Sequence, residues 1–110
     1  MENRQKVLNM IGLATKAGKT VSGEFSTEKA VKTGKAWLVI VSEEASNNTR
    51  KMFTNMCTYY HVPVCFFGKK EELGHSMGKE FRASLAITDE GFAKTLVKQM
   101  NVNGGSKYES

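Results

Sequence analysis

The stretch that decides the fold is Ala36-Trp37-Leu38-Val39-Ile40-Val41, a continuous apolar run in the first half of the chain. A strand with one exposed face would alternate apolar and polar residues, so this run predicts a strand that is covered on both faces. Such a strand requires helices on both sides of its sheet. The segments before and after the run are therefore expected to supply those helices.

Two helices are predicted before this run. Apolar residues recur with a helical period from about residue 4 to Lys16, and Gly18 suits the position just after a helix end. Thr20-Val21 can form only a short strand, and a second helix is predicted from Ser22-Gly23 to Gly34. The residues expected on the inner side of the first helix are Val7, Leu8, Ile11 and Ala14.

The remainder of the chain continues this alternation, which predicts an α/β domain with a mainly parallel or mixed sheet. The domain is expected to span residues 1–101, followed by a flexible tail over 102–110. The later elements are a helix capped by Ser46, a strand over 64–67, a short helix over 69–75, a loop bracketed by Gly74 and Gly78, a strand over 85–87 and a last helix capped by Thr88 or Asp89.

Composition excludes several classes of protein. The 110 residues fit one small domain, and no apolar run approaches the roughly 18–20 residues of a membrane helix. Two cysteines and the absence of an export signal indicate a reducing cytoplasm rather than a secreted disulfide scaffold. Lys and Arg number 16 against 11 Asp and Glu, an excess that favours an anionic partner. Most of that excess lies in residues 1–35, which hold seven basic and three acidic side chains.

No residue pattern indicates catalysis, and neither a cofactor nor a metal is expected. The two histidines, His61 and His75, lie in predicted loops without a nucleophile and an orienting acid around them. Cys57, His61 and Cys65 are spaced by four residues, as metal ligands on one helix could be. Because Pro63 breaks that helix, the sequence favours buried cysteines and a loop histidine.

Two glycine-marked turns with basic residues form the candidate binding site. The stretch Gly23-Glu24-Phe25-Ser26-Thr27-Glu28-Lys29 opens a helix, whose free N–H groups suit a phosphate. The hydroxyls of Ser26 and Thr27 either contact RNA phosphates and base edges or only cap the first turn. The stretch Gly78-Lys79-Glu80-Phe81-Arg82 offers a phenyl ring between cations, which either stacks on an unpaired base or packs on the core.

A set of short stretches along most of the chain carries a family resemblance. They are Ile11–Lys19, Ser22-Gly23, Lys29–Val31, Gly34–Ala36, Leu38–Val41, Val62–Val64, Leu73-Gly74 and Ala86–Asp89. With the order of the elements, these stretches resemble the kink-turn-binding ribosomal protein family, the L7Ae superfamily, and within it the bacterial YlxQ-like branch.

This resemblance implies a three-layer α-β-α sandwich with a four-stranded mixed sheet. It also implies binding of a kinked RNA helix–bulge–helix. With the residue patterns above, we expect a non-catalytic monomer that binds structured RNA, either ribosomal RNA or another kinked RNA, in or near the ribosome and away from membranes. In the family, the start of the second helix meets the sheared G·A pairs, and the loop before the last strand touches the extruded base. The residues so expected to contact RNA are Gly23, Glu24, Phe25, Ser26, Thr27, Lys29, Lys32, Lys35, Gly78, Lys79, Phe81 and Arg82.

The family signature Asn-Glu-x-Thr-Lys is only partly present. Gly23 and Lys29 match, whereas Phe25, Ser26 and Glu28 occupy the Asn, Glu and Thr positions. Three alternatives follow: weaker kink-turn binding, binding to another structured RNA, or a protein-interaction module anchored by Phe25. Lys32 and Lys35 either contact phosphates or are ordinary solvated lysines.

Overall fold

The computed structural model describes residues 2–101, and the tail predicted over 102–110 lies outside the described residues. Within them, helices and strands alternate along the chain as the sequence predicts. The boundary of the domain at residue 101 stays a prediction. The elements are α1 (Glu2–Lys16), β1 (Thr20–Ser22), α2 (Glu24–Lys32), β2 (Leu38–Val41), α3 (Asn47–Tyr60), β3 (Val64–Phe66), α4 (Lys70–Ser76), β4 (Ser84–Ile87) and α5 (Glu90–Asn101).

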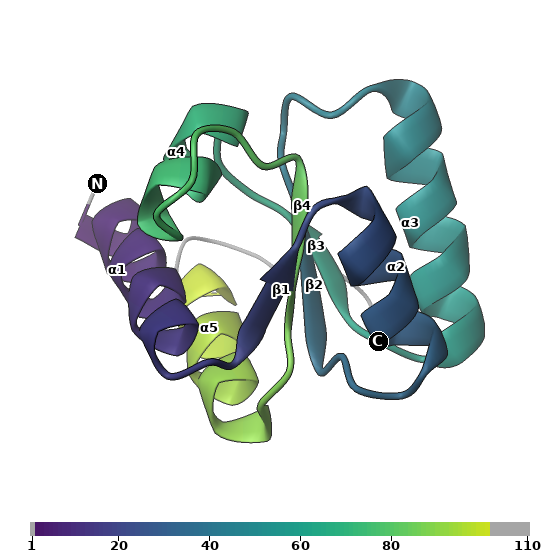
Figure 1. Cartoon of the computed structure of the whole chain (residues 1–110), viewed down its shortest axis with the longest axis horizontal. Helices are drawn as coiled ribbons and strands as arrows, with labels where there is room; N and C mark the ends of the chain where they lie inside the picture. The colour runs from purple at the N-terminus through teal and green to yellow at the C-terminus, as the bar shows by residue number, and fades with distance from the viewer. Residues whose placement is uncertain (1, 102–110) are drawn as a thin grey trace.

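The strands form one mixed sheet in the order β1-β4-β2-β3. Helices α1, α4 and α5 cover one face and α2 and α3 the other, which gives three layers (Figure 1). The predicted α-β-α sandwich with a four-stranded mixed sheet is therefore confirmed. The alternative of a mainly parallel sheet is wrong, because only β2 and β3 run parallel. Helix α4 is short, so the chain that follows it is still at the end of the sheet where β3 finishes. Strand β4 therefore starts at that end and runs antiparallel to β2.

The central strand β2 is buried on both faces, as its apolar run predicts. Leu38 and Ile40 face the core beneath α1 and α5, while Val39 and Val41 face the core beneath α2 and α3. The predicted run begins too early, however, because the strand starts at Leu38. Trp37 lies beside the ends of α2 and α3, beyond the cover of either helix, and 48% of its surface is exposed.

Local signals in the sequence set the helix ends. Gly18 and Gly34 follow α1 and α2 with φ of 74° and 77°, a backbone conformation that glycine adopts without strain. Ser46 caps α3 through its side chain, as predicted. Of the two predicted caps of α5, Asp89 is the one used, since its Oδ2 accepts a hydrogen bond of 2.9 Å from the N–H of Phe92.

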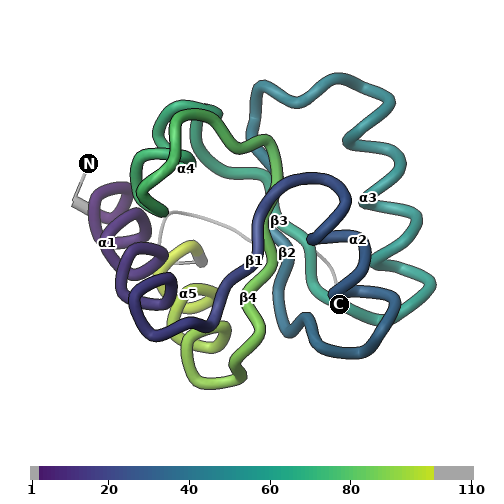
Figure 2. The backbone as a smooth tube through the Cα atoms, in the orientation of Figure 1, coloured from purple at the N-terminus to yellow at the C-terminus, as the bar shows by residue number. Residues whose placement is uncertain are grey.

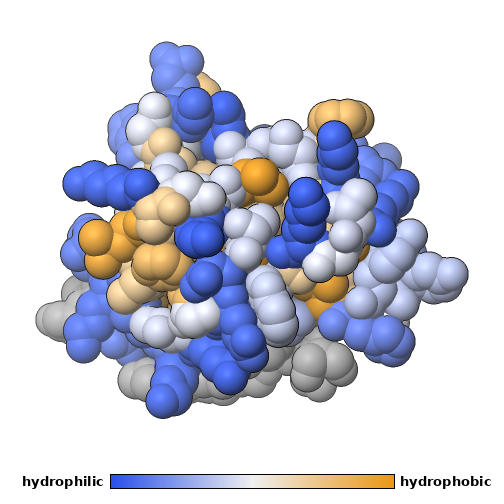
Figure 3. Space-filling view, turned by 60° about the horizontal axis from the view of Figure 1, so that its bottom comes forward, coloured by the Kyte–Doolittle hydropathy of each residue, from blue (hydrophilic) through white to orange (hydrophobic). Residues whose placement is uncertain are grey.

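The surface carries scattered large apolar residues. Figure 3 shows hydrophobic colour on the left, the side of α1 and α5 in Figure 1, and in smaller separate areas elsewhere on this face, among hydrophilic side chains. Between Glu2 and Asn101, no helix combines the length and apolar character needed to cross a membrane. The exposed large hydrophobic side chains are those of Leu13, Phe25, Trp37, Tyr59, Tyr60 and Phe81.

Candidate nucleic-acid interface

The two turns singled out in the sequence lie side by side at one edge of the sheet. Gly23 donates a backbone hydrogen bond of 2.9 Å to the carbonyl of Ser84, the first residue of β4. Arg82 Nε donates another, of 2.8 Å, to Ser22 Oγ at the end of β1. Figure 2 lets the reader follow both segments to this edge of the sheet. The fold thus brings together the start of α2 and the loop that precedes β4.

The start of α2 presents free backbone donors. Gly23 is the N-cap, and no side chain caps the helix. Its φ of 91° and ψ of 158° are a conformation that L side chains rarely adopt, although a Cβ there would meet nothing within 4 Å. The N–H groups of residues 24–26 have no intrahelical acceptor, and the helix dipole is positive at this end. Together these features suit an anionic oxygen.

The side chains of α2 divide sharply between its two sides. Thr27 is fully buried, and its Oγ1 lies 3.5 Å from the donating hydroxyl of Ser84, so it lies inside the domain and not on the surface where the sequence places it. Ser26 is half-buried. On the outer side, Phe25 exposes 77% of its surface and Lys29 is exposed. A cation and an aromatic ring therefore flank the free N–H groups.

The loop before β4 is exposed at its centre and anchored at its end. Phe81 exposes 59% of its surface, so its ring does not pack on the core, and Gly78 and Lys79 are also exposed. Arg82 is half-buried and donates from its backbone N–H to the carbonyl of Lys70 at 3.0 Å. Its Nη1 donates to the carbonyl of Phe81 at 2.7 Å. The loop therefore offers a ring and a lysine while Arg82 holds it in place.

Gly74 has a different place from the one predicted. The sequence places it at the edge of the loop, but it lies inside α4. A Cβ at this glycine would lie 2.5 Å from the carbonyl oxygen of Glu80 and 2.7 Å from the nitrogen of Phe81. The loop packs so closely on α4 that only a residue without a side chain fits there.

The lysines near α2 differ in their surroundings. Lys32 Nζ lies 3.2 Å from a carboxylate oxygen of Glu28, one helical turn away. Both side chains are substantially exposed, so the pair contributes at most about 1 kcal/mol. Lys35, in the loop after α2, is exposed, as is Glu24 at the start of the helix. Whether Lys32 and Lys35 contact phosphates stays a prediction.

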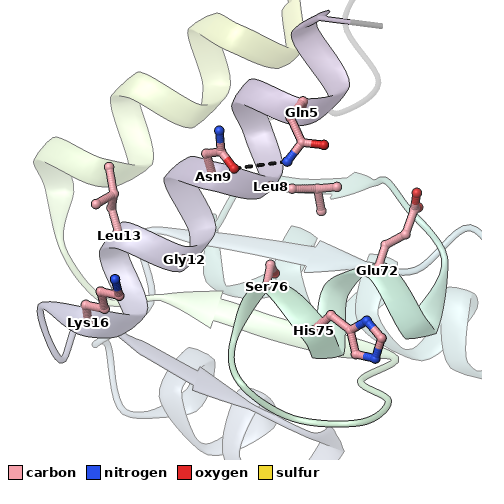
Figure 4. A pocket seen from close by; sticks show the side chains of 9 residues that line it. All are labelled: Gln5, Leu8, Asn9, Gly12, Leu13, Lys16, Glu72, His75 and Ser76. Carbon is pink, nitrogen blue, oxygen red and sulfur yellow. Dashed lines mark hydrogen bonds between the residues drawn. The ribbon is translucent and has the colours of Figure 1, made fainter.

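A groove with a volume of about 750 Å³ lies between α1 and α4 (Figure 4). Several of its polar side chains are already engaged. Gln5 Nε2 donates to Asn9 Oδ1 at 3.0 Å, and Ser76 Oγ donates to the carbonyl of Leu73 at 2.8 Å. Glu72 accepts hydrogen bonds from Arg4, which hold the pKa of Glu72 below its ordinary value. The groove is lined by Gln5, Leu8, Asn9, Gly12, Leu13, Lys16, Glu72, His75 and Ser76.

The two cysteines lie on opposite faces of the sheet. Cys57 belongs to the core beneath α2 and α3, whereas Cys65 faces α5 and donates to Met100 Sδ at 3.3 Å. Burial raises the pKa of each thiol to about 12, which keeps both protonated. They cannot serve one metal together. No group of three or more potential metal ligands occurs within residues 2–101.

A three-layer sandwich in which a glycine-initiated helix meets a basic loop defines a class of small α/β proteins. The model of the ribosomal protein L7Ae/L30e/S12e/Gadd45 family matches residues 5–97. The chain therefore belongs to this family. Its relatives include a protein named RNA-binding protein YlxQ of Bacillus subtilis (strain 168), 42% identical over 92 residues that cover 84% of this chain and 92% of the relative.

Other comparisons agree. A second protein named RNA-binding protein YlxQ, of Enterococcus faecium, is 41% identical over 84% of this chain and 88% of its own. A solved structure of a protein of unknown function from Bacillus halodurans has a TM-score of 0.85 and 34% identity, over 87% of this chain and 97% of that one. The Giardia lamblia 15.5kD RNA binding protein shares the fold, with a TM-score of 0.79 and 22% identity, over 93% of this chain and 90% of its own.

Proposed function

We propose that this protein binds structured RNA of the kink-turn type, without catalysis, through the start of α2 and the loop before β4. The observation that carries the proposal is the joining of these two segments by Arg82 and Ser22 and by Gly23 and Ser84. The proposal has further support from the names of two relatives, each more than 40% identical, which describe them as RNA-binding proteins. Because the chain belongs to a ribosomal protein family, we extend the proposal to ribosomal or ribosome-associated RNA as the ligand.

Each part of the interface has a physical role in this proposal. The free N–H groups of residues 24–26 bind a phosphate of the kinked strand, with the helix dipole behind them. Lys29 neutralises a neighbouring phosphate. Phe81 stacks on the extruded base while Lys79 contacts its backbone. Thr27 supports the helix from within.

Recognition relies on RNA shape more than on base edges. Phe25 and Ser26 stand where the family has an amide and a carboxylate, which can each form paired hydrogen bonds to a base edge. A phenyl ring has no such donors, and a half-buried hydroxyl offers one. The backbone N–H groups and lysines contact phosphates, whose positions depend on the kink.

A second candidate function rests on Phe25. Its side chain exposes 77% of its surface in the first turn of α2, and exposed aromatic residues anchor many protein interfaces. In this alternative the same edge of the sheet binds a protein partner. The RNA proposal accounts for more of the site, because it also uses the uncapped helix start and the exposed lysines.

The test is a titration of the full chain with a kink-turn RNA and with a matched RNA whose G·A pairs are replaced. Both titrations are made at low and at moderate salt. The expected result is tighter binding to the intact kink-turn, with an affinity that falls steeply as salt rises, because bound lysines release counterions. Equal binding to both RNAs would reject kink-turn recognition. Absence of binding to either would favour the protein-interaction alternative.

A further inference from the structure

The opposite end of α2 carries a second concave surface, which we call the aromatic cleft. It is a hollow of about 460 Å³ between the ends of α2 and α3, lined among others by Lys32, Trp37, Tyr60, His61 and Pro63. Trp37 exposes 48% and Tyr60 39% of their surfaces. The cleft is separate from the interface described above, which lies at the start of the same helix. Two broad rings thus remain accessible at a site that the proposed function does not use.

An exposed stripe of α2 connects the interface to the cleft. Phe25, Lys29 and Lys32 are spaced at i, i+4 and i+7, so they lie along one side of the helix. The buried residues of α2 lie on its other side. Nine residues span about 13 Å, at 1.5 Å per residue. An RNA strand that is bound at the start of α2 would therefore need only a few more nucleotides to reach the cleft.

The charges along this path suit a polyanion. Lys29 and Lys32 are exposed along the helix, and Lys35 follows in the loop that leads to Trp37. Among the described residues that line the cleft, none is acidic. Two carboxylates belong to the same helix: Glu24 is exposed at its start, and Glu28 is paired with Lys32 at 3.2 Å. Because that pair is exposed and weak, Lys32 can exchange the carboxylate for a phosphate at little cost.

We propose that the aromatic cleft binds unpaired nucleotides of an RNA whose kinked part is held at the start of α2. This inference rests on the proposed function and adds the single-stranded flank to its ligand. Bases would stack on Trp37 and Tyr60, while Lys32 and Lys35 neutralise the phosphates between them. Aromatic rings interleaved with cations form this kind of site in proteins that bind single strands without strict sequence preference. Continuity of the lysines with the interface favours RNA over a protein partner here.

Trp37 makes the proposal directly measurable, because it is the only tryptophan of the chain. Its fluorescence reports on the cleft and on no other place in the molecule. The experiment uses the full chain and two RNAs, a blunt kink-turn duplex and the same duplex with a single-stranded uridine extension. We expect the extension to quench the fluorescence and to tighten binding about tenfold, the usual effect of stacking about one base. The blunt duplex should bind without quenching.

A pair of variants separates stacking from general damage. Trp37→Ala should bind the blunt duplex as the wild type does and should lose the tenfold gain from the extension. The backbone N–H of residue 37, which donates to the carbonyl of Ile87 at 2.8 Å, is retained in this variant. Leu13→Ala is the control, since Leu13 is 53% exposed on α1, on the other side of the sheet. The Leu13→Ala variant should keep the full tenfold gain in affinity from the extension.

The outcomes distinguish the two proposals. Failure of both duplexes to bind would reject the proposed function. Binding of both duplexes with equal affinity, and without quenching, would leave that function intact and overturn the inference about the cleft. Quenching and affinity that both stayed unchanged in Tyr60→Ala would contradict the stacking role proposed for Tyr60.

Discussion

Arg82 Nε donates a hydrogen bond of 2.8 Å to Ser22 Oγ, joining two residues that are 60 positions apart in the chain. Ser22 ends β1, directly before the glycine that starts α2, and Arg82 ends the loop that carries Phe81. Together with the backbone hydrogen bond from Gly23 to Ser84, this bond holds the two segments proposed to bind RNA beside each other. An RNA that touches both segments must match the distance between them, so the bond contributes to the shape that the protein can recognise.

Ser22→Ala tests this relationship. Removal of the hydroxyl takes away the acceptor of Arg82 Nε, so the loop is expected to become less well ordered. We expect a loss of about 1 kcal/mol in the free energy of unfolding, as for an ordinary hydrogen bond. Affinity for the kink-turn RNA should fall several-fold, because ordering of the loop is then part of the cost of binding. Titration with RNA and denaturant unfolding measure the two effects.

Thr95→Ala is the matched control for that variant. Thr95 Oγ1 donates to the carbonyl of Gly91 at 3.1 Å on α5, so it also loses one hydroxyl hydrogen bond. Its RNA affinity should stay at the wild-type value. If Ser22→Ala also retained full affinity, the hydrogen bond between Arg82 and Ser22 would have no part in recognition.

Gly74→Ala should be harmful although alanine is the better helix former. In a helix, alanine is ordinarily more stable than glycine by about 0.5–1 kcal/mol. At Gly74 the new Cβ would lie 2.5 Å from the backbone oxygen of Glu80, so the loop must move. We expect a net loss of about 1–3 kcal/mol, typical of overpacking, together with weaker RNA binding.

Gly91→Ala provides the comparison for Gly74→Ala. Its Cβ would meet only the capping carboxylate oxygen of Asp89, at 3.2 Å, a side-chain atom that needs to shift by only a few tenths of an ångström. Thermal unfolding should therefore show a smaller change in this variant than in Gly74→Ala. Equal melting temperatures for the two variants would mean that the loop before β4 can move away from α4 with no loss of stability.

The sequence predicts most of the fold because its signals are local. The apolar run that contains Leu38–Val41 requires cover on both faces, and Gly18 and Gly34 mark the helix ends through their own backbone conformations. The direction of β4 is not a local property. It depends on how far α4 carries the chain, so the sequence could not separate a mainly parallel sheet from a mixed one.

The candidate site is less accessible to sequence reasoning. The two turns can be singled out from their glycines and cations, but the bond between Arg82 and Ser22 depends on tertiary packing. Thr27 shows the same limit, since a hydroxyl in a first helical turn gives no sign of being buried against Ser84. The sequence assigns Trp37 to the strand because its apolar character continues the run, whereas its position beyond the helix ends leaves it exposed.

The buried thiols should be inert in the folded protein. Burial raises the pKa of Cys57 and of Cys65 from the ordinary 9.0 to about 12, so almost no thiolate is present at neutral pH. A thiol reagent should label neither cysteine in native buffer and both in denaturant. Because the raised pKa belongs to the folded state, stability should decline as the pH rises above about 9, where unfolded thiols ionise first. Fast labelling under native conditions would contradict this burial.

The ion pair of Arg4 and Glu72 should make a small, pH-dependent contribution to stability. It ties α1 to α4, and the hydrogen bond from Arg4 holds the pKa of Glu72 below its ordinary 4.5. A depressed carboxyl pKa stabilises the fold above the unfolded value, and this contribution disappears as the pH falls through the folded value. Glu72→Gln should therefore cost at most about 1 kcal/mol at neutral pH, given the exposure of both side chains.

Denaturant unfolding of the wild type and of Glu72→Gln across acid and neutral pH measures that contribution. The difference between the two proteins should be constant near neutrality and should shrink below about pH 4.5. A difference that stays constant into the acid range would show that the loss comes from packing or from the capping hydrogen bond of Lys69 to Glu72, and not from charge.

Lys32 and Lys94 give a matched pair for locating the RNA. Each lysine is paired with a glutamate four residues earlier at 3.2 Å, Lys32 with Glu28 on α2 and Lys94 with Glu90 on α5. Replacement of either by alanine removes the same kind of exposed ion pair, so both variants should lose a similar, small amount of stability. Affinity for the kink-turn RNA with the single-stranded extension should fall for Lys32→Ala and for Lys29→Ala, but not for Lys94→Ala. The salt dependence of binding should also become shallower, by about one released counterion for each phosphate that a variant no longer neutralises. If all three variants had the same titration curve, the interface would lie away from α2.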